Sequence, residues 1–178
     1  MQLQLKSCLL RSWSLDDAAA VQRYANNRKI WLNLRNIFPH PYGLEDAQNF
    51  LRYVMQNEPQ AILAIATPAE AIGCIGLRLG SDVHVKTAEL GYWLGEPFWG
   101  HGIMSEAVAE FTRYAFQTFA LVRVFAEPFA SNHASARVLE KAGFVCEALL
   151  RSNIFKDGQV LDSRLYARVR KAESQHER

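Results

Sequence analysis

The chain has 178 residues, of which 49% are hydrophobic and 21% charged, and its formal net charge at pH 7 is +2. This length and composition fit one globular domain, and the small net charge, without a block of basic residues, argues against a nucleic-acid partner. No apolar run approaches the roughly 20 residues that cross a bilayer and the N-terminus lacks the features of a signal peptide, so we expect no membrane partner and a cytoplasmic location.

The first half of the chain alternates short apolar runs with helical patterns. Residues 2–11 predict a strand, and Ser14 is suited to cap a helix that extends to about residue 27, because a serine hydroxyl accepts hydrogen bonds from a first helical turn. Residues 28–43 are expected to be irregular or briefly helical, and helical spacing resumes at about Leu44. Three apolar runs then predict strands, at residues 61–66, 71–79 and 88–94.

The periodicity changes after the third of these strands. Residues 96–102 contain one proline and two glycines and predict a turn. A stripe of apolar residues spaced four apart then predicts a long helix over residues 103–119; its members are Ile103, Ala107, Phe111 and Ala115. Residues 121–126 form a β-rich run, and residues 132–142 predict a second helix.

The C-terminal part predicts a β-hairpin. Asp157-Gly158 is a strong turn signal between strands near residues 144–155 and 160–169. Strands that precede, separate and follow the helices indicate a mixed α/β domain with a largely antiparallel central sheet of about six or seven strands, flanked by helices. With no internal repeat or linker, this single domain is expected to cover residues 1–170, followed by a polar tail over residues 171–178.

The cysteines and histidines give no sign of a disulfide framework or a metal site. Cys8, Cys74 and Cys146 are far apart and each lies in an apolar stretch, so we interpret all three as buried, reduced thiols. The five histidines are equally scattered. We therefore assign no metal.

The segment Gly100-His101-Gly102, at a predicted strand-to-helix turn, indicates an anion site. Neither glycine carries a Cβ, so the backbone can approach a ligand closely. The unpaired N–H groups and the positive dipole of the following helix suit a pyrophosphate. The turn lacks the Gly-Lys-Ser/Thr ending of a nucleotide P-loop and the third glycine of a dinucleotide fingerprint. Taken alone, it is also compatible with a simple tight turn.

Three segments resemble the GNAT acyltransferases, and within them the RimJ/RimL branch, which acetylates protein N-termini. The first runs Glu89-Leu90-Gly91-Tyr92-Trp93-Leu94 and then Pro97-x-Trp99-Gly100-His101-Gly102-Ile103-Met104-Ser105-Glu106-Ala107. The second runs from Asn132 to Phe144, and the third is Phe38-Pro39-His40-Pro41-Tyr42 followed by Asp46-Ala47. They cover nearly the whole chain in the family's order. The resemblance implies the GNAT fold and an N-acetyltransferase that uses acetyl-CoA.

The resemblance also implies where acetyl-CoA binds. In the family, the strand before the glycine turn separates from its neighbour and its backbone pairs with the pantetheine arm, a role that falls here to Trp93 and Leu94. Asn132 is expected to hydrogen-bond the pantetheine, and its position is that of a helix N-cap. The pyrophosphate is expected to lie against the backbone amides of the turn, formed by Trp99, Gly100, His101, Gly102, Ile103, Met104 and Ser105.

Two residues are the candidates for catalysis. Ser135 lies one helical turn after Asn132, so the two share one face, and the resemblance directs Ser135 toward the thioester sulfur. Many family members have a tyrosine, acting as general acid, where this chain has Leu139; that role passes to Ser135, to a water or to no residue. Glu89 is the candidate base, directly or through a water. It is equally well interpreted as an ordinary exposed or salt-bridged strand carboxylate.

The acceptor must be a neutral amine when it attacks the thioester. An α-amino group is roughly a tenth neutral at pH 7, whereas a lysine amine is less than a thousandth neutral, so an N-terminal acceptor needs only modest help from a base. No cysteine falls within the matched segments, which favours direct transfer over an acyl-enzyme. The resemblance implies that Trp31, Arg35, Phe38 and Tyr42 wall the acceptor pocket; a packed lid without substrate contact is the alternative.

Several functions remain open at this point. The acceptor is a peptide N-terminus or a small amine such as a polyamine, an amino acid or an antibiotic; an open groove over residues 31–42 would favour the first and a strongly acidic pocket the second. A non-catalytic acyl-CoA-binding module on the same fold is the third reading. A Rossmann-like or flavodoxin-like nucleotide domain is disfavoured, because its glycine turn follows the first strand. Exposed strand edges and the terminal hairpin would permit a homodimer.

Overall fold

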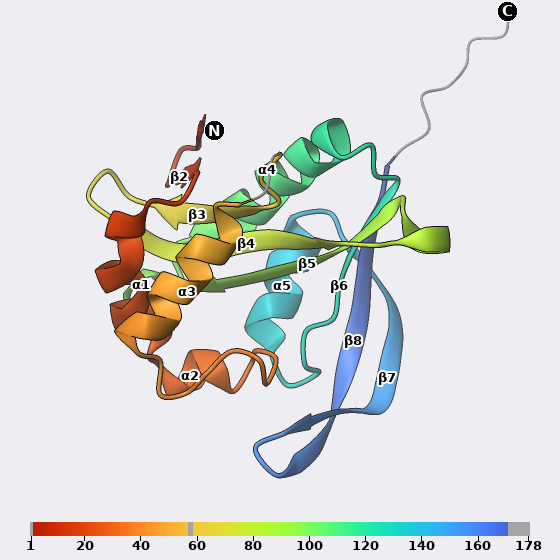
Figure 1. The fold of residues 1–178 in the computed structure, drawn as a ribbon. Helices are drawn as coiled ribbons and strands as arrows, with labels where there is room; N and C mark the ends of the chain where they lie inside the picture. The colour runs from red at the N-terminus through yellow and green to blue at the C-terminus, as the bar shows by residue number, and fades with distance from the viewer. Residues whose placement is uncertain (1, 57–58, 171–178) are drawn as a thin grey trace, which may run out of the picture.

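The computed structural model describes residues 2–56 and 59–170, which form a mixed sheet with helices on both faces (Figure 1). The sheet has eight strands in the order β1-β2-β3-β4-β5-β6-β8-β7. The strands are β1 (Gln2–Gln4), β2 (Leu9–Arg11), β3 (Ile62–Ala66), β4 (Ala71–Leu79), β5 (Thr87–Leu94), β6 (Arg123–Ala126), β7 (Val145–Lys156) and β8 (Gln159–Val169). All neighbouring strands pair antiparallel except β5 and β6, which are parallel. The predicted α/β class and the largely antiparallel sheet are confirmed.

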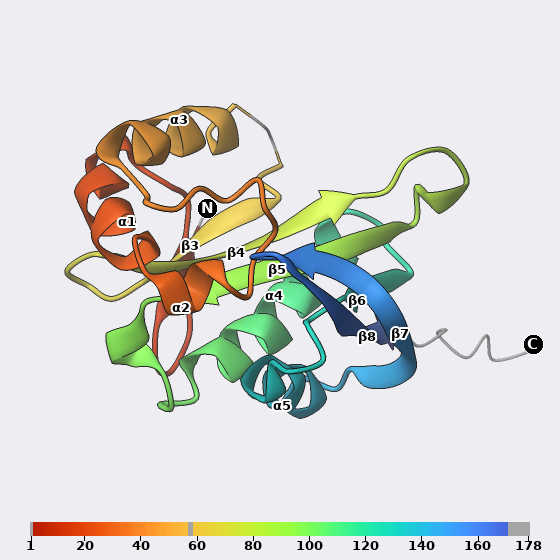
Figure 2. The same cartoon turned by 90° about the horizontal axis from the view of Figure 1, so that it is seen from below.

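The helices lie in two layers (Figure 2). The α-helices are α1 (Ala18–Ala25), α2 (Arg28–Trp31), α3 (Leu44–Val54), α4 (Ile103–Thr118) and α5 (His133–Lys141), and the short 3-10 helices are η1 (Leu15–Asp17), η2 (Asp82–His84) and η3 (Glu96–Phe98). The helices α1 and α3 cover one face of the sheet and α4 and α5 cover the other, while the short α2 lies next to α1 beyond the ends of the strands. Among these helices, none is long and apolar enough to cross a membrane.

Each face of the sheet has its own hydrophobic core. The larger core packs α4 and α5 against the central strands and contains the whole predicted α4 stripe of Ile103, Ala107, Phe111 and Ala115. The smaller core packs α1 and α3 against β3 and β4, through residues such as Val21, Leu51 and Ala64. Both faces of the central strands are therefore buried against helices, and β5 lies in the middle of this sandwich.

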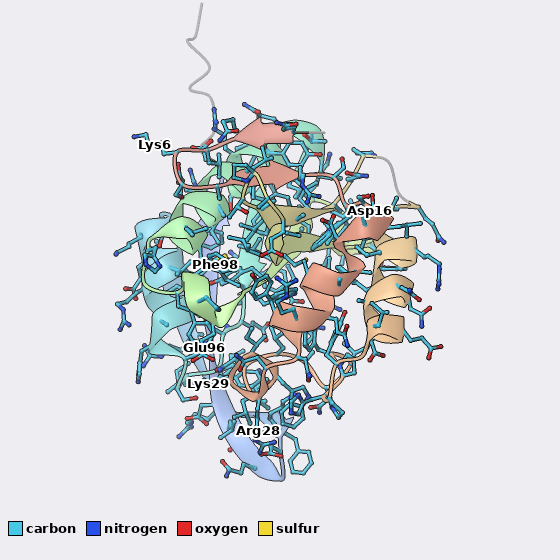
Figure 3. All side chains as sticks on the ribbon, turned by 90° about the vertical axis from the view of Figure 1, so that its left-hand side faces the viewer. Lys6, Asp16, Arg28, Lys29, Glu96 and Phe98 are labelled. Atoms are coloured by element: carbon cyan, nitrogen blue, oxygen red, sulfur yellow. The ribbon has the colours of Figure 1, made fainter. Side chains whose placement is uncertain are left out.

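Residues 2–11 form two strands and not the single strand that their apolar pattern predicts. The chain turns back at Leu5, whose N–H donates to the Cys8 carbonyl at 3.0 Å. The carboxylate of Glu106, about one hundred residues away, accepts from the backbone N–H groups of Lys6 and Ser7 at 2.7 and 3.0 Å (Lys6 is labelled in Figure 3). The strand count therefore rises to eight because of a long-range contact that the local pattern does not contain.

The cysteine interpretation is correct for two of the three residues. Cys8 and Cys74 are buried, whereas Cys146 is exposed. Cys146 lies on β7, which is the last strand of the sheet and has one uncovered edge. Within the described ranges, no three His, Cys, Asp or Glu side chains group as metal ligands would. The predicted polar tail, residues 171–178, lies outside the described residues.

Candidate active site

A gap opens in the sheet where β5 and β6 separate. The two strands pair over only three positions, and Glu89 opposite Phe125 is the last of them. On its other edge β5 stays paired with β4 as far as Leu94, which lies opposite Gly73. One edge of β5 is therefore unpaired from Leu90 to Leu94, a stretch in which strand backbone offers hydrogen bonds to another chain or ligand.

Alternate residues of β5 point their backbone groups into this gap. The N–H of Gly95 donates to the Ile72 carbonyl on β4 at 2.8 Å. The Trp93 carbonyl faces the same way, since a Cβ built on Gly73 would lie 2.5 Å from its oxygen. Because neighbouring strand residues direct their N–H and C=O groups to opposite edges, the gap receives those of Leu90, Tyr92 and Leu94. Of the two strand residues expected to pair with pantetheine, Leu94 thus faces the gap and Trp93 faces β4.

The glycine turn leaves a row of N–H groups open at the start of α4. Gly100 and Gly102 both have φ of +80°, in the left-handed region, and no atom lies within 4 Å of the position of either missing Cβ. Gly102 is the N-cap and offers no side chain to the helix. The amides of Ile103, Met104 and Ser105 precede the first intrahelical hydrogen bond, which runs from Glu106 N–H to the Gly102 carbonyl. The geometry is that of an anion site at a helix N-terminus.

Neighbouring side chains hold this turn in place. The indole N–H of Trp99 donates to the Leu94 carbonyl at 2.7 Å and so ties the turn to the end of β5. Ile103 and Met104 bury their side chains in the core, which leaves only their backbone facing outward. The His101 side chain is exposed. Both carboxylate oxygens of Glu106, in the first turn of α4, accept hydrogen bonds from the turn between β1 and β2.

Replacing Gly102 with alanine should weaken acetyl-CoA binding. The left-handed backbone costs an alanine about 1–2 kcal/mol, and the new methyl group would occupy the open space in front of the α4 amides. We expect KM for acetyl-CoA to rise at least about tenfold, the equivalent of one hydrogen bond to a charged group. Gly158→Ala is the matched control, because Gly158 has φ of +76° and an equally open Cβ position in the hairpin turn. An equal rise in KM for both variants would contradict the assignment.

The N-terminus of α5 brings a serine and a tyrosine together beside the gap. Asn132 is the N-cap of α5, as predicted, and its Oδ1 accepts from the Ser135 N–H at 3.0 Å. The Ser135 Oγ lies 2.7 Å from the Tyr92 hydroxyl. Burial raises the pKa of Tyr92 well above its usual value. Leu139, one turn further along α5, is fully buried in the core.

Glu89 lies on the opposite face of β5, between two arginines. Its Oε1 pairs with Arg35 and its Oε2 with Arg78, whose Nε also donates at 3.1 Å. The Glu89 side chain is only 13% exposed. Arg78 lies on β4, directly opposite Glu89 in the pairing of β4 with β5, so the strand register brings the two side chains together. With both oxygens engaged, Glu89 reaches a proton only through a water or after one arginine moves.

An open patch of sheet lies between Glu89 and Trp93. Side chains alternate along a strand, so Glu89, Gly91 and Trp93 share one face. Gly91 is exposed, and nothing lies within 4 Å of where its Cβ would be. Phe38 closes one side of this patch, with its ring 6.3 Å from that of Trp93. Arg35 reaches Glu89 on the other side, so the structure brings these two predicted wall residues to the patch.

The other two predicted wall residues have different surroundings. Tyr42 is buried and packs behind Phe38, with ring centroids 4.9 Å apart. Trp31 stacks on His40 and lies against Lys156, whose Nζ is 3.8 Å from the centre of the indole. Lys156 is 2% exposed and its Nζ has no hydrogen-bond partner, and burial lowers its pKa. The Lys156 ammonium and the face of the Trp31 ring therefore form a cation–π contact.

The N-terminal end of helix α2 is tied to two other parts of the structure, which positions the predicted wall residues that follow it. Lys29 and Asn27 both hydrogen-bond Glu96, just beyond β5, and these bonds, that of Lys29 first, lower the pKa of Glu96 (Figure 3). Arg28 pairs with Asp157 in the turn between β7 and β8 at 2.6 Å. The segment therefore bridges the end of β5 and the hairpin.

Sequence reasoning missed three residues of this region. Tyr92 shares the side-chain face of Leu90 and Leu94, and strand alternation could have directed it toward α5 and Ser135. Arg78 could have been found only from the register of β4 on β5. Lys156 precedes a predicted hairpin turn, where a lysine is ordinarily exposed, so no signal pointed to its burial.

Comparisons with known proteins agree with this geometry. Residues 8–145 match the acetyltransferase (GNAT) domain family. The chain is 35% identical over 176 residues to the uncharacterized N-acetyltransferase YoaA of Bacillus subtilis, covering 96% of this chain and 98% of that one. It is 36% identical over 100 residues to the ribosomal-protein-serine acetyltransferase of Escherichia coli, covering 56% and 55% of the two chains. The solved structure of RimL, a ribosomal L7/L12 alpha-N-protein acetyltransferase, in complex with coenzyme A has a TM-score of 0.82 at 21% identity and covers 95% of this chain and 98% of that one.

Proposed function

Because this chain belongs to the GNAT acetyltransferase family and is an acetyl-transferring enzyme, we propose that it transfers acetyl from acetyl-CoA directly to the α-amine of a protein or peptide N-terminus. Support for this acceptor class comes from relatives named as ribosomal-protein acetyltransferases. The RimL neighbour was solved with coenzyme A, which supports the donor.

The charge around the open patch between Glu89 and Trp93 is the main observation in favour of a peptide N-terminus as the acceptor. The one carboxylate described on the open patch, Glu89, is paired with two guanidinium groups, those of Arg35 and Arg78. A further basic side chain, that of Lys156, lies against the predicted wall residue Trp31. With its one described carboxylate paired to two arginines, the patch is not strongly acidic and lacks the unpaired negative charge that would favour a polyamine, which carries several positive charges. A peptide N-terminus brings one amine, roughly a tenth of it already neutral at pH 7.

The proposed chemistry uses both sides of β5. The pantetheine lies in the gap between β5 and β6 and the pyrophosphate lies against the α4 amides, while the amine approaches over Gly91. The amine nitrogen attacks the thioester carbonyl, whose developing oxyanion is stabilised by a backbone N–H of β5. A water held by Glu89 removes the proton from nitrogen. The Ser135 hydroxyl then hydrogen-bonds the departing thiolate.

Direct transfer is supported by the state of the Cys74 thiol. Cys74 lies opposite Trp93 on β4, on the acceptor face. Burial raises the pKa of its thiol to about 12. The thiolate, not the thiol, is the nucleophile of cysteine chemistry. Cys74 therefore stays protonated at neutral pH and is unsuited to form an acyl-enzyme.

Thiol release from acetyl-CoA, measured against a panel of acceptors, tests the proposal. The panel contains short peptides with free and with blocked N-termini, a polyamine and single amino acids. Turnover is expected with free N-termini and absent with the blocked ones. Turnover confined to the polyamine or the amino acids would show that the acceptor is a small amine and not a peptide N-terminus. Tight acetyl-CoA binding without turnover on any amine would favour the non-catalytic binding module.

Replacing Glu89 with glutamine should lower kcat/KM for a peptide acceptor about tenfold at pH 7. A base can at most raise the neutral fraction of an α-amine from roughly a tenth to one before attack, and this advantage disappears as pH rises above about 8. The defect is therefore expected to shrink between pH 7 and pH 9. Glu147→Gln is the matched control, since Glu147 is also a strand carboxylate paired with an arginine, Arg123. If the loss of activity in Glu89→Gln does not change with pH, Glu89 acts through its ion pairs with Arg35 and Arg78 and not as a base.

A further inference from the structure

The hydrogen bond between Tyr92 and Ser135 joins the two elements that border the gap. Tyr92 projects from the part of β5 that β6 leaves unpaired, and Ser135 lies in the first turn of α5. Their oxygens are 2.7 Å apart, although the residues are 43 positions apart in sequence. No step of the chemistry above uses the Tyr92 hydroxyl. A half-buried phenol hydrogen-bonded to the proposed thiolate-facing serine therefore needs an explanation.

The direction of this hydrogen bond follows from the acidity of the two hydroxyls. A phenol is a stronger hydrogen-bond donor than an alkyl hydroxyl, which favours Tyr92 as the donor to the Ser135 Oγ at 2.7 Å; the Ser135 carbonyl, at 3.4 Å, is the more distant alternative acceptor. Burial raises the pKa of Tyr92, so the phenol keeps its hydrogen across the neutral range. A serine hydroxyl has one hydrogen and two lone pairs. Once one lone pair accepts from Tyr92, the serine hydrogen is directed to a third partner.

Leu139 occupies the α5 position at which the family resemblance would place a tyrosine, and Tyr92 supplies a phenol to the same region. Leu139 lies four residues after Ser135, so both face the same side of the helix. Leu139 has no exposed surface and no hydroxyl. Tyr92 brings a phenol to that helix face from β5 instead. The same chemical group is thus present beside Ser135, although it comes from a different element.

We propose that Tyr92 is a positioning residue: its hydroxyl fixes the Ser135 hydroxyl so that the serine hydrogen points at the sulfur of coenzyme A. As the nitrogen–carbon bond forms and the carbon–sulfur bond breaks, the sulfur leaves with the electron pair and accepts this hydrogen bond. Tyr92 loses no proton, because a phenol is a weaker acid than the thiol that is formed. The inference rests on the proposed placement of Ser135 at the sulfur and is independent of which amine is the acceptor.

The pKa of the bound coenzyme A thiol tests this inference without an acceptor. Thiolate formation is followed by ultraviolet absorbance as pH rises, with protein bound to desulfo-coenzyme A as the blank. A free thiol titrates near 8.5. We expect the wild-type protein to lower this pKa by about one unit, a tenfold stabilisation of the thiolate. Tyr92→Phe and Ser135→Ala should each return it toward 8.5, and the double variant should do no more than either alone.

Tyr166→Phe is the matched control. Tyr166 is a buried tyrosine on the same side of the sheet core, but its hydroxyl is bonded to Glu140 at 2.9 Å and not to Ser135. This variant should leave the pKa of the bound thiol unchanged. Melting temperatures, and the affinity for desulfo-coenzyme A, establish that the variants are folded.

Kinetics provide the second readout. With any acceptor that turns over, Tyr92→Phe should lower kcat and leave KM for acetyl-CoA unchanged, and its effect should disappear in a Ser135→Ala background. The inference is overturned if Tyr92→Phe leaves the thiol pKa at the wild-type value, or if its effect and that of Ser135→Ala simply add. Failure of the whole acceptor panel would remove the proposed acceptor, and the thiol titration would still decide the role of Tyr92.

Discussion

Replacing Ser135 with alanine is expected to lower kcat roughly a hundredfold, with little change in KM for acetyl-CoA. The Oγ is the hydroxyl at the α5 N-terminus that borders the β5–β6 gap. A hydrogen bond to a charged group contributes about 1.5–3 kcal/mol, and the upper end of this range corresponds to a loss of roughly a hundredfold when the bond to the departing thiolate is removed. The Ser135 N–H still bonds Asn132 in the variant, so the cap of α5 is retained. Thiol release under saturating acetyl-CoA measures the effect.

Ser81→Ala is the control for the serine substitution, because Ser81 is exposed before η2 and its side chain makes no cap hydrogen bond. It should leave both kinetic constants unchanged. A rise in KM for acetyl-CoA without a change in kcat would mean that Ser135 binds the donor in the ground state only. An unchanged kcat and KM would remove Ser135 from the reaction.

Replacing Phe111 with alanine should lower the free energy of unfolding by about 3–5 kcal/mol, the usual cost of deleting a buried aromatic side chain. Phe111 has no exposed surface and lies in the middle of the α4 stripe. Because domains are stable by only about 5–15 kcal/mol, the variant should be close to unfolding at 37 °C. Urea denaturation followed by circular dichroism measures the loss.

Tyr53→Ala is the matched control for the aromatic deletion, since Tyr53 is 61% exposed on α3. It should change stability by less than about 0.5 kcal/mol. Acetyl-CoA at 100 times its Kd should add about 2.7 kcal/mol to the stability of the wild type and of Phe111→Ala alike. A Phe111→Ala protein that is folded and stable but no longer stabilised by acetyl-CoA would mean that this part of α4 shapes the binding turn directly.

Elements with a strong local code were predicted closely from the sequence. The four-residue spacing from Ile103 gave a helix that ends within one residue of its predicted end. The Asp157-Gly158 turn placed the hairpin, because a glycine there relieves the left-handed backbone that the turn requires. The Asn132 cap was also predicted, since its role depends only on the next three residues.

Contacts set by register and packing could not be read from the sequence. The turn at Lys6 depends on Glu106, and the surroundings of Glu89 depend on the alignment of β4 with β5. A one-residue change in that alignment would move Arg78 to the other face. The burial of Lys156 depends on α2 docking over the hairpin. The structure places Arg35 and Phe38 beside β5, whereas Trp31 and Tyr42 lie elsewhere. The roles of all the predicted donor and acceptor residues stay predictions.

The single parallel pair in the sheet has a consequence for how the molecule holds together. Strands β1 to β5 and strands β6 to β8 are two antiparallel blocks that share only three residue pairs. On the proposed binding mode, the pantetheine arm lies beside β5 where a ninth strand would otherwise complete the seam between the blocks. The donor is then a structural component as well as a reagent: each turnover inserts a piece of sheet and each release of coenzyme A removes it.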